Sequence, residues 1–152
     1  MACDSCWQSS HVQTTSLNKI DRFASGALFG SAGDGDLRAL QALLDKVRSI
    51  EKLPSRTELA ALKCDVEGIL VFPNGQVAMI AISPGGADRN NLDHYDAQIW
   101  PANRGLAAVG TGAELALGAM AAGKNARHAV AIACRFDINS RLPVHAMSLR
   151  KR

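Results

Sequence analysis

The sequence predicts one α+β domain in which helices cover stacked antiparallel sheets. Three observations support this prediction. The chain has 152 residues, enough for a single domain with its own core. Hydrophobic residues make up 47% of it and charged residues 20%, which excludes a disordered polymer. Patterns typical of strands and of helices alternate in the order strands, two helices, strands, two helices, strand.

Charge and cysteine usage limit the organisation and the partners. Residues 1–149 are the expected domain, and residues 150–152 are a basic tail. The formal net charge of +3 is too mild to favour nucleic acid as a partner. No apolar run approaches the roughly 18 residues of a membrane helix, and the start Met-Ala-Cys-Asp has no signal-peptide pattern. The four cysteines are not spaced like a disulfide framework, so we expect a cytoplasmic protein.

The first third of the chain combines short strands with one helix. Residues 12–15 and 27–29 have the composition of strands. A helix is expected over residues 37–51, because Asp36 stands where an N-cap belongs and Pro54 follows the end. Apolar residues at helical spacing support it: Leu37, Leu40, Leu43, Leu44, Val47 and Ile50.

The middle of the chain predicts a capped helical turn followed by a β-hairpin. Ser55 and Glu58 have the spacing of a capping box. The apolar runs 66–72 and 77–82 are separated by Pro-Asn-Gly-Gln at 73–76. Asn-Gly tolerates a positive φ, so these runs are expected to pair through a tight turn.

The last third adds a loop, two strands, two helices and a closing strand. Gly123 is expected just beyond the first of these helices, and Asn125 is expected to cap the second. We expect these elements, in chain order, at 83–94, 97–100, 106–109, 113–122, 126–136 and 143–149. The side chains of the second helix expected to point inward are Val130, Ile132, Ala133 and Phe136.

Four motifs, in this order, resemble segments of proteasome β-subunits and their bacterial relatives of the HslV type. They are ACDS at 2–5, Asn-Lys-Ile at 18–20, GALFGSAGDGD at 26–36 and AAVGTGAELALGAMAAGKNARHAVAIACRFDINS at 107–140. The resemblance extends over residues 2–149, and its last third is the most specific part.

The resemblance implies a fold, an activity and partners. The fold would be the four-layer αββα sandwich of N-terminal-nucleophile hydrolases, two antiparallel sheets between two helical layers. The activity would be that of a threonine-type peptidase subunit that hydrolyses peptide bonds in polypeptides without a cofactor or metal. The family also suggests a homo-oligomeric ring and an ATP-dependent unfoldase as partners.

The same resemblance assigns roles to individual residues. Lys19 would be the ammonium that favours loss of the nucleophile's proton, and Asp4 would hold that ammonium in place. Gly33 would supply the backbone N–H that stabilises the oxyanion. The remaining polar groups would surround the terminal amine: Thr111, where the family usually has Ser, Asp137 and Ser140.

The chain departs from the family at its front. The family's catalytic threonine opens a strand that precedes the aspartate matched by Asp4, and the chain as given lacks this strand and its threonine. Neither Thr14 nor Cys3 replaces it. Thr14 has no carboxylate at the family's spacing, and on an extended segment Cys3 points away from Asp4. Two explanations stay open: a start assigned too far downstream, or a catalytically inactive ring or scaffold subunit.

A small zinc-binding module is a distant alternative. Cys3 and Cys6 have the spacing of a zinc-ligand pair, and His11 follows. A structural zinc site takes four ligands, and the sequence has no second pair at the required spacing.

Overall fold

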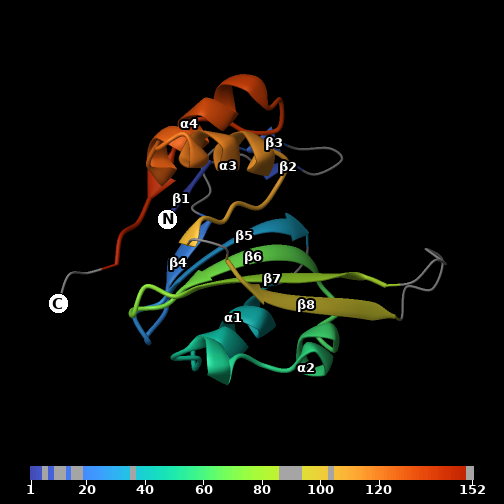
Figure 1. Cartoon of the computed structure of the whole chain (residues 1–152). Helices are drawn as coiled ribbons and strands as arrows, with labels where there is room; N and C mark the ends of the chain where they lie inside the picture. The colour runs from blue at the N-terminus through green and yellow to red at the C-terminus, as the bar shows by residue number, and fades with distance from the viewer. Residues whose placement is uncertain are drawn as a thin grey trace.

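The computed structural model of the whole chain describes residues 1–4, 7–8, 13–14, 19–34, 37–85, 94–102 and 105–149. Its largest element is a five-stranded antiparallel sheet in which each strand pairs with the next strand along the chain (Figure 1). The strands are β4 (Ile20–Arg22), β5 (Leu28–Asp34), β6 (Asp65–Val71), β7 (Val77–Pro84) and β8 (Tyr95–Pro101).

Three short helices cover one face of this sheet. They are α1 (Arg38–Leu44), the 3₁₀ turn η1 (Ile50–Lys52) and α2 (Arg56–Ala60). Alternation along β6 sends Val66 and Leu70 toward these helices, where both are fully buried. Phe29 of β5 stacks on Phe23, with ring centroids 5.7 Å apart. This face therefore holds the main hydrophobic core.

The opposite side of the sheet faces a second group of elements (Figure 1). They are α3 (Ala113–Ala121), α4 (Ala126–Phe136) and two small antiparallel sheets. One pairs β1 (Ala2–Cys3) with β9 (His145–Ala146), and the other pairs β2 (Trp7–Gln8) with β3 (Gln13–Thr14). Ala116, Ala129 and Ala133 form a small core between α3 and α4, because small side chains let two helices approach closely.

Locally coded elements agree with the sequence predictions. Ser55 and Glu58 form the reciprocal capping box at the start of α2. The β6–β7 hairpin turns through Gly75 at a φ of +87°, and the Phe72 N–H bonds to the Gln76 carbonyl. The side chain of Asn125 caps α4 by accepting the N–H of His128.

Other predicted elements differ in the structure. The helix expected over 37–51 ends at Leu44. The Asp45 carboxylate, just beyond it, accepts the N–H of Ala24, and the apolar residues that follow still join the core. The strand expected at 106–109 is absent, because the segment pairs with no strand among the described residues. The closing strand is limited to β9. Phe136, expected to point inward, is 72% exposed.

The fold is thus mixed α+β with antiparallel sheets, as the sequence predicts. Helices lie on both sides of the five-stranded sheet (Figure 1). Among the described residues, every helix is too short or too polar to cross a bilayer.

Candidate active site

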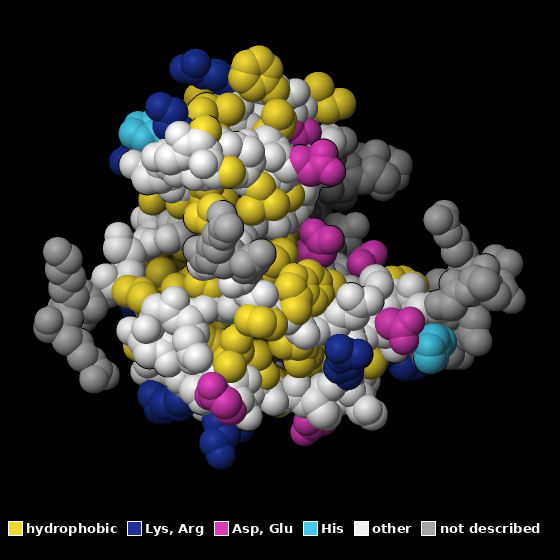
Figure 2. All heavy atoms as spheres, in the orientation of Figure 1, with side chains coloured by type: hydrophobic (Ala, Val, Ile, Leu, Met, Phe, Trp, Pro, Cys, Tyr) yellow, Lys and Arg dark blue, Asp and Glu magenta, His cyan; other side chains and the backbone are white. Residues whose placement is uncertain are grey.

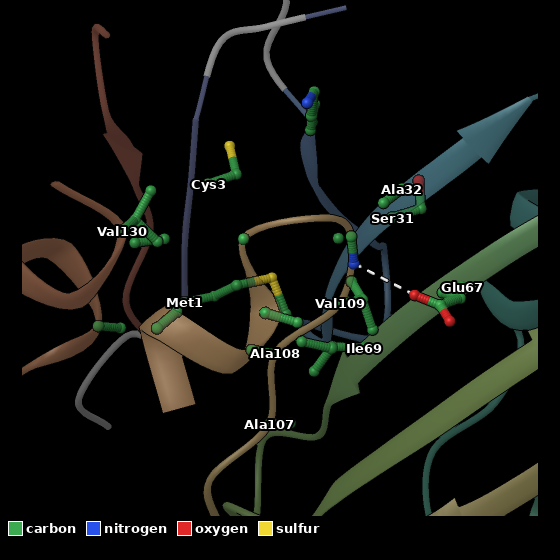
Figure 3. A pocket seen from close by; sticks show the side chains of 18 of the residues that line it. Met1, Cys3, Ser31, Ala32, Glu67, Ile69, Ala107, Ala108, Val109 and Val130 are labelled. Atoms are coloured by element: carbon green, nitrogen blue, oxygen red, sulfur yellow. Dashed lines mark hydrogen bonds between the residues drawn. The ribbon is translucent and has the colours of Figure 1, made fainter. Parts of the chain in front are cut away.

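A cavity of about 900 Å³ lies between the five-stranded sheet and the group formed by α3, α4 and β1. Its walls are mainly apolar, and hydrophobic side chains gather where the two parts of the molecule meet (Figure 2). Met1, Cys3 and Val130 line it from one side and Ile69 from the other (Figure 3). The side chains of Ile69, Val71 and Val77 on this face of the sheet therefore line the cavity rather than a packed layer.

The first polar group at the cavity is an ion pair. Lys19 Nζ lies 2.7 Å from Asp4 Oδ1, and the side chains are only 23% and 14% exposed. The other carboxylate oxygen of Asp4 accepts the backbone N–H of Arg141 at 3.2 Å. Asp4 follows β1 and Lys19 precedes β4, so the pair joins segments that flank two different sheets. The partial burial strengthens this pair relative to one on the open surface.

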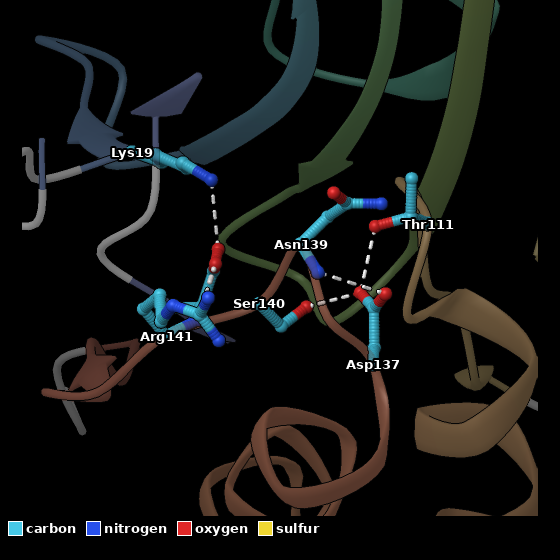
Figure 4. A network of polar contacts seen from close by, with 7 residues as sticks. Lys19, Thr111, Asp137, Asn139, Ser140 and Arg141 are labelled. Carbon is cyan, nitrogen blue, oxygen red and sulfur yellow. Dashed lines mark hydrogen bonds and ion pairs between the residues drawn. The ribbon is translucent and has the colours of Figure 1, made fainter. Parts of the chain in front are cut away.

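The second polar group is centred on Asp137, directly after α4. Its Oδ2 accepts the hydroxyl of Thr111 at 2.7 Å and the hydroxyl of Ser140 at 2.6 Å. Its Oδ1 accepts the backbone N–H of Asn139 at 3.1 Å (Figure 4). Thr111 and Ser140 line the cavity, so Asp137 holds two hydroxyls at the cavity's edge.

These hydrogen bonds govern the ionisation of Asp137. Partial burial acts to raise its pKa, but the hydroxyls of Ser140 and Thr111, the N–H of Asn139 and the charge of Arg141 together hold the pKa below its usual value. The carboxylate is therefore ionised at neutral pH and acts as an acceptor.

The two polar groups belong to one site. The segment 137–141 joins them, because Ser140 donates to Asp137 while the next residue, Arg141, donates to Asp4. On α4, burial raises the pKa of the Cys134 thiol, and the carboxylates of Asp4 and Asp137 raise it further, whereas Lys19 lowers it. The Cys134 thiol thus lies within electrostatic range of both the Asp4–Lys19 pair and Asp137.

The predicted site residues therefore converge. Asp4, Lys19, Gly33, Thr111 and Ser140 all line the cavity, and Asp137 bonds to the last two.

Gly33 needs a separate explanation. Its φ is +130°, and a Cβ there would collide with the backbone of Asp65 on β6. Glycine is therefore required at this position by the close approach of two strands. Gly30 lies nearer to Lys19, because it pairs with Ile20 and a Cβ there would lie 3.5 Å from the Lys19 carbonyl oxygen. Gly30 also lines the cavity.

Glu67 is a site-lining residue that the sequence analysis missed. Its Oε2 accepts the N–H of Gly110 at 3.1 Å across the cavity (Figure 3). It also lines a smaller cavity of about 290 Å³, together with Trp100 and Glu114. The signal in the sequence was a charged residue inside an apolar strand, at a position where alternation points away from the helix-covered face.

Three nucleophilic side chains that line the cavity, those of Thr111, Ser140 and Cys3, are not activated. The hydroxyls of Thr111 and Ser140 both donate to Asp137, with no basic nitrogen in those hydrogen bonds. Burial is the main cause that raises the pKa of the Cys3 thiol, so the thiol stays protonated and is a poor nucleophile.

Metal binding finds no support in the described part of the chain, where no three His, Cys, Asp or Glu side chains are grouped as ligands. Of the zinc ligands considered above, Cys6 and His11 lie outside the described residues.

Comparisons with known proteins add no family assignment. No protein-family model matches the chain, and no curated protein matches it.

Proposed function

We propose that this chain is a proteasome-like, threonine-type peptidase subunit that hydrolyses peptide bonds in polypeptides. The observation that carries the proposal is the cavity with the Asp4–Lys19 ion pair and the Asp137 hydrogen-bond network at its edge. An amino-terminal nucleophile needs a nearby cation and hydrogen-bond partners for its amine. The ammonium, two carboxylates and two hydroxyls at this cavity could supply both. The resemblance in residues 2–149 supports the same activity.

The nucleophile in this proposal is a threonine on a strand that precedes residue 1 and enters the cavity beside Met1 to Asp4. Its hydroxyl oxygen attacks the peptide carbonyl carbon, and the hydroxyl proton passes to the threonine's own α-amine. The C–N bond then breaks, the leaving amine takes that proton, and an ester remains. Water hydrolyses the ester and restores the hydroxyl.

Each polar residue of the site has a role in this scheme. The ammonium of Lys19 favours loss of the hydroxyl proton by charge, and Asp4 keeps the ammonium in place at 2.7 Å. Asp137, with the hydroxyls of Thr111 and Ser140, provides hydrogen-bond partners for the α-amine.

The oxyanion donor is proposed to be a glycine of β5. The resemblance points to Gly33, but that residue's glycine requirement is already explained by its approach to Asp65. The position of Gly30, next to Ile20 in the sheet and therefore near Lys19, favours Gly30 for this role.

The wider architecture belongs to the same proposal. A strand in the cavity would complete the four-layer αββα sandwich. We further propose a homo-oligomeric ring in the cytoplasm, with an ATP-dependent unfoldase as a candidate partner. Three large hydrophobic side chains after and at the end of α4 support assembly by their exposure: Phe136 at 72%, Ile138 at 78% and Leu142 at 62%.

The decisive experiment starts from the mature protein in its native host. Mass spectrometry of the N-terminal peptide is expected to find a threonine preceding residue 1, and that form should hydrolyse fluorogenic peptides. Lys19→Ala in this form should lower kcat at least ~100-fold, because no ammonium then favours the loss of the threonine hydroxyl proton.

The matched control is Lys52→Ala, which removes the same charge from the exposed turn η1. It should leave kcat unchanged, and circular dichroism should show that both variants keep the fold. Retention of more than about a tenth of the wild-type kcat by Lys19→Ala would contradict the proposed role.

A second candidate function is an inactive ring or scaffold subunit of the same fold. The observation that favours it is that Thr111, Ser140 and Cys3, among the described residues lining the cavity, are not activated as nucleophiles. A mature chain that begins at Ala2, assembles and hydrolyses no peptide would support this candidate over the enzyme.

A further inference from the structure

Glu67 makes a contact that the proposed chemistry does not use. Its carboxylate crosses from β6 to accept the N–H of Gly110 at 3.1 Å. Among the described residues, this is the hydrogen bond that ties the segment 105–112 to the five-stranded sheet. The length of 3.1 Å lies in the ordinary range for an N–H···O hydrogen bond.

The contact fixes the backbone directly before Thr111. Gly110 has a φ of +87°, and a Cβ there would lie 3.2 Å from Cβ of Ala32 on β5. The peptide thus turns close above the sheet, and the next residue reaches Asp137 with its hydroxyl at 2.7 Å. Thr111 is consequently held between two carboxylates, Glu67 through the preceding N–H and Asp137 through its own side chain.

Glu67 stands beside apolar residues on the cavity-facing side of its strand. Ile69 and Val71 follow it on the same side of β6, and all three line the cavity. Glu67 itself is exposed, so its carboxylate stays solvated while it accepts the Gly110 N–H.

We propose that Glu67 is a positioning residue of the site, which fixes Gly110 and thereby holds the hydroxyl of Thr111 on Asp137. Its importance for catalysis rests on the proposed function, whereas the contact and its effect on Asp137 can be measured without any activity.

The experiment compares Glu67→Ala with Glu67→Gln, whose amide oxygen can still accept the Gly110 N–H. In Glu67→Ala we expect the Gly110 amide to exchange about tenfold faster by NMR. The pKa of Asp137, followed by carboxyl ¹³C shifts, should move up toward its usual range because the Thr111 hydroxyl is held less firmly. Glu67→Gln should retain most of both wild-type values.

Two further variants separate positioning from folding and from charge. Glu67→Asp keeps the charge on a shorter side chain that no longer reaches Gly110. It should change both readouts as Glu67→Ala does, and it provides the test if the alanine variant does not fold. Asp65→Asn removes a charge from the same side of β6 and should leave both readouts unchanged. An unchanged Asp137 pKa in Glu67→Ala and Glu67→Asp, or an equal change in Asp65→Asn, would overturn the inference.

Kinetics give an independent readout. If the mature protein hydrolyses peptides, Glu67→Ala should lower kcat about tenfold with little change in KM, and Glu67→Gln should restore most of it. If both NMR effects occur and no form of the protein hydrolyses peptides, the positioning contact stands and the proposed function fails.

Discussion

Asp137 gives the clearest pH-dependent behaviour at the scale of single residues. Its pKa is lower in the folded chain than in the unfolded chain, since partial burial is outweighed by the hydrogen bonds from Ser140, Thr111 and Asn139. The ionised carboxylate therefore stabilises the fold above the unfolded pKa of about 3.9. This contribution is lost as the pH falls through the lower folded pKa.

The test is urea unfolding of the wild type and of Asp137→Asn at several pH values. At pH 7 the variant should be less stable by on the order of 1 kcal/mol, a small value because the site is partly solvated. The difference should shrink as the pH falls below about 4. A difference that stays constant from pH 7 to about pH 2.5 would show that the hydrogen bonds to Asp137 do not depend on its charge.

At the scale of elements, two glycines differ in how much space surrounds them. A Cβ at Gly68 on β6 would lie 2.7 Å from the ring of Phe29, inside the main core. We expect Gly68→Ala to lower the free energy of unfolding by about 1–3 kcal/mol. Gly118 on α3 has nothing within 4 Å of a Cβ, so Gly118→Ala should raise it by about 0.5–1 kcal/mol. Thermal or urea unfolding of both variants would reveal any reversal of sign.

How well an element could be predicted depended on where its partners lie in the sequence. The β6–β7 hairpin, the Ser55 cap and α4 with its Asn125 cap are coded by neighbouring residues, and each is present. The strand expected at 106–109 needed a distant partner that the sequence pattern could not supply. Helical periodicity alone placed Phe136 inside, but α4 ends there and the residue is exposed.

The site was predictable only in part, for the same reason. The pairing of Asp4 with Lys19 followed from the order of motifs in a resembling family and not from local pattern. The same resemblance placed Thr111, Asp137 and Ser140 around an amine, but the hydrogen bonds that the two hydroxyls and Asn139 form with Asp137 were not predicted. Glu67 could not be found in that way. Its role depends on a bond to Gly110, 43 residues further along the chain, and alternation by itself makes such a residue a solvated charge.

At the scale of the whole molecule, the cavity and the packed core should respond differently to a larger side chain. Val130 on α4 is half-buried and lines the cavity, whereas Val47 lies in the packed core and is 5% exposed. Val130→Leu should stabilise the chain by up to about 0.8 kcal/mol, the value of one buried methylene. The same added methylene in Val47→Leu should destabilise it by about 1–3 kcal/mol. Equal losses in urea unfolding would mean that the cavity is closed in solution.

The pairing of β1 with β9 has a consequence for how the molecule assembles. The strands β4 to β8 join neighbours along the chain, so each ladder closes a much shorter loop than the pairing of Ala2 with Ala146, which spans almost the entire polypeptide. Closing so long a loop costs the most chain entropy and is rewarded only when the rest is in place. We therefore expect Asp4 to reach Arg141, 137 residues away, only after the large sheet has formed.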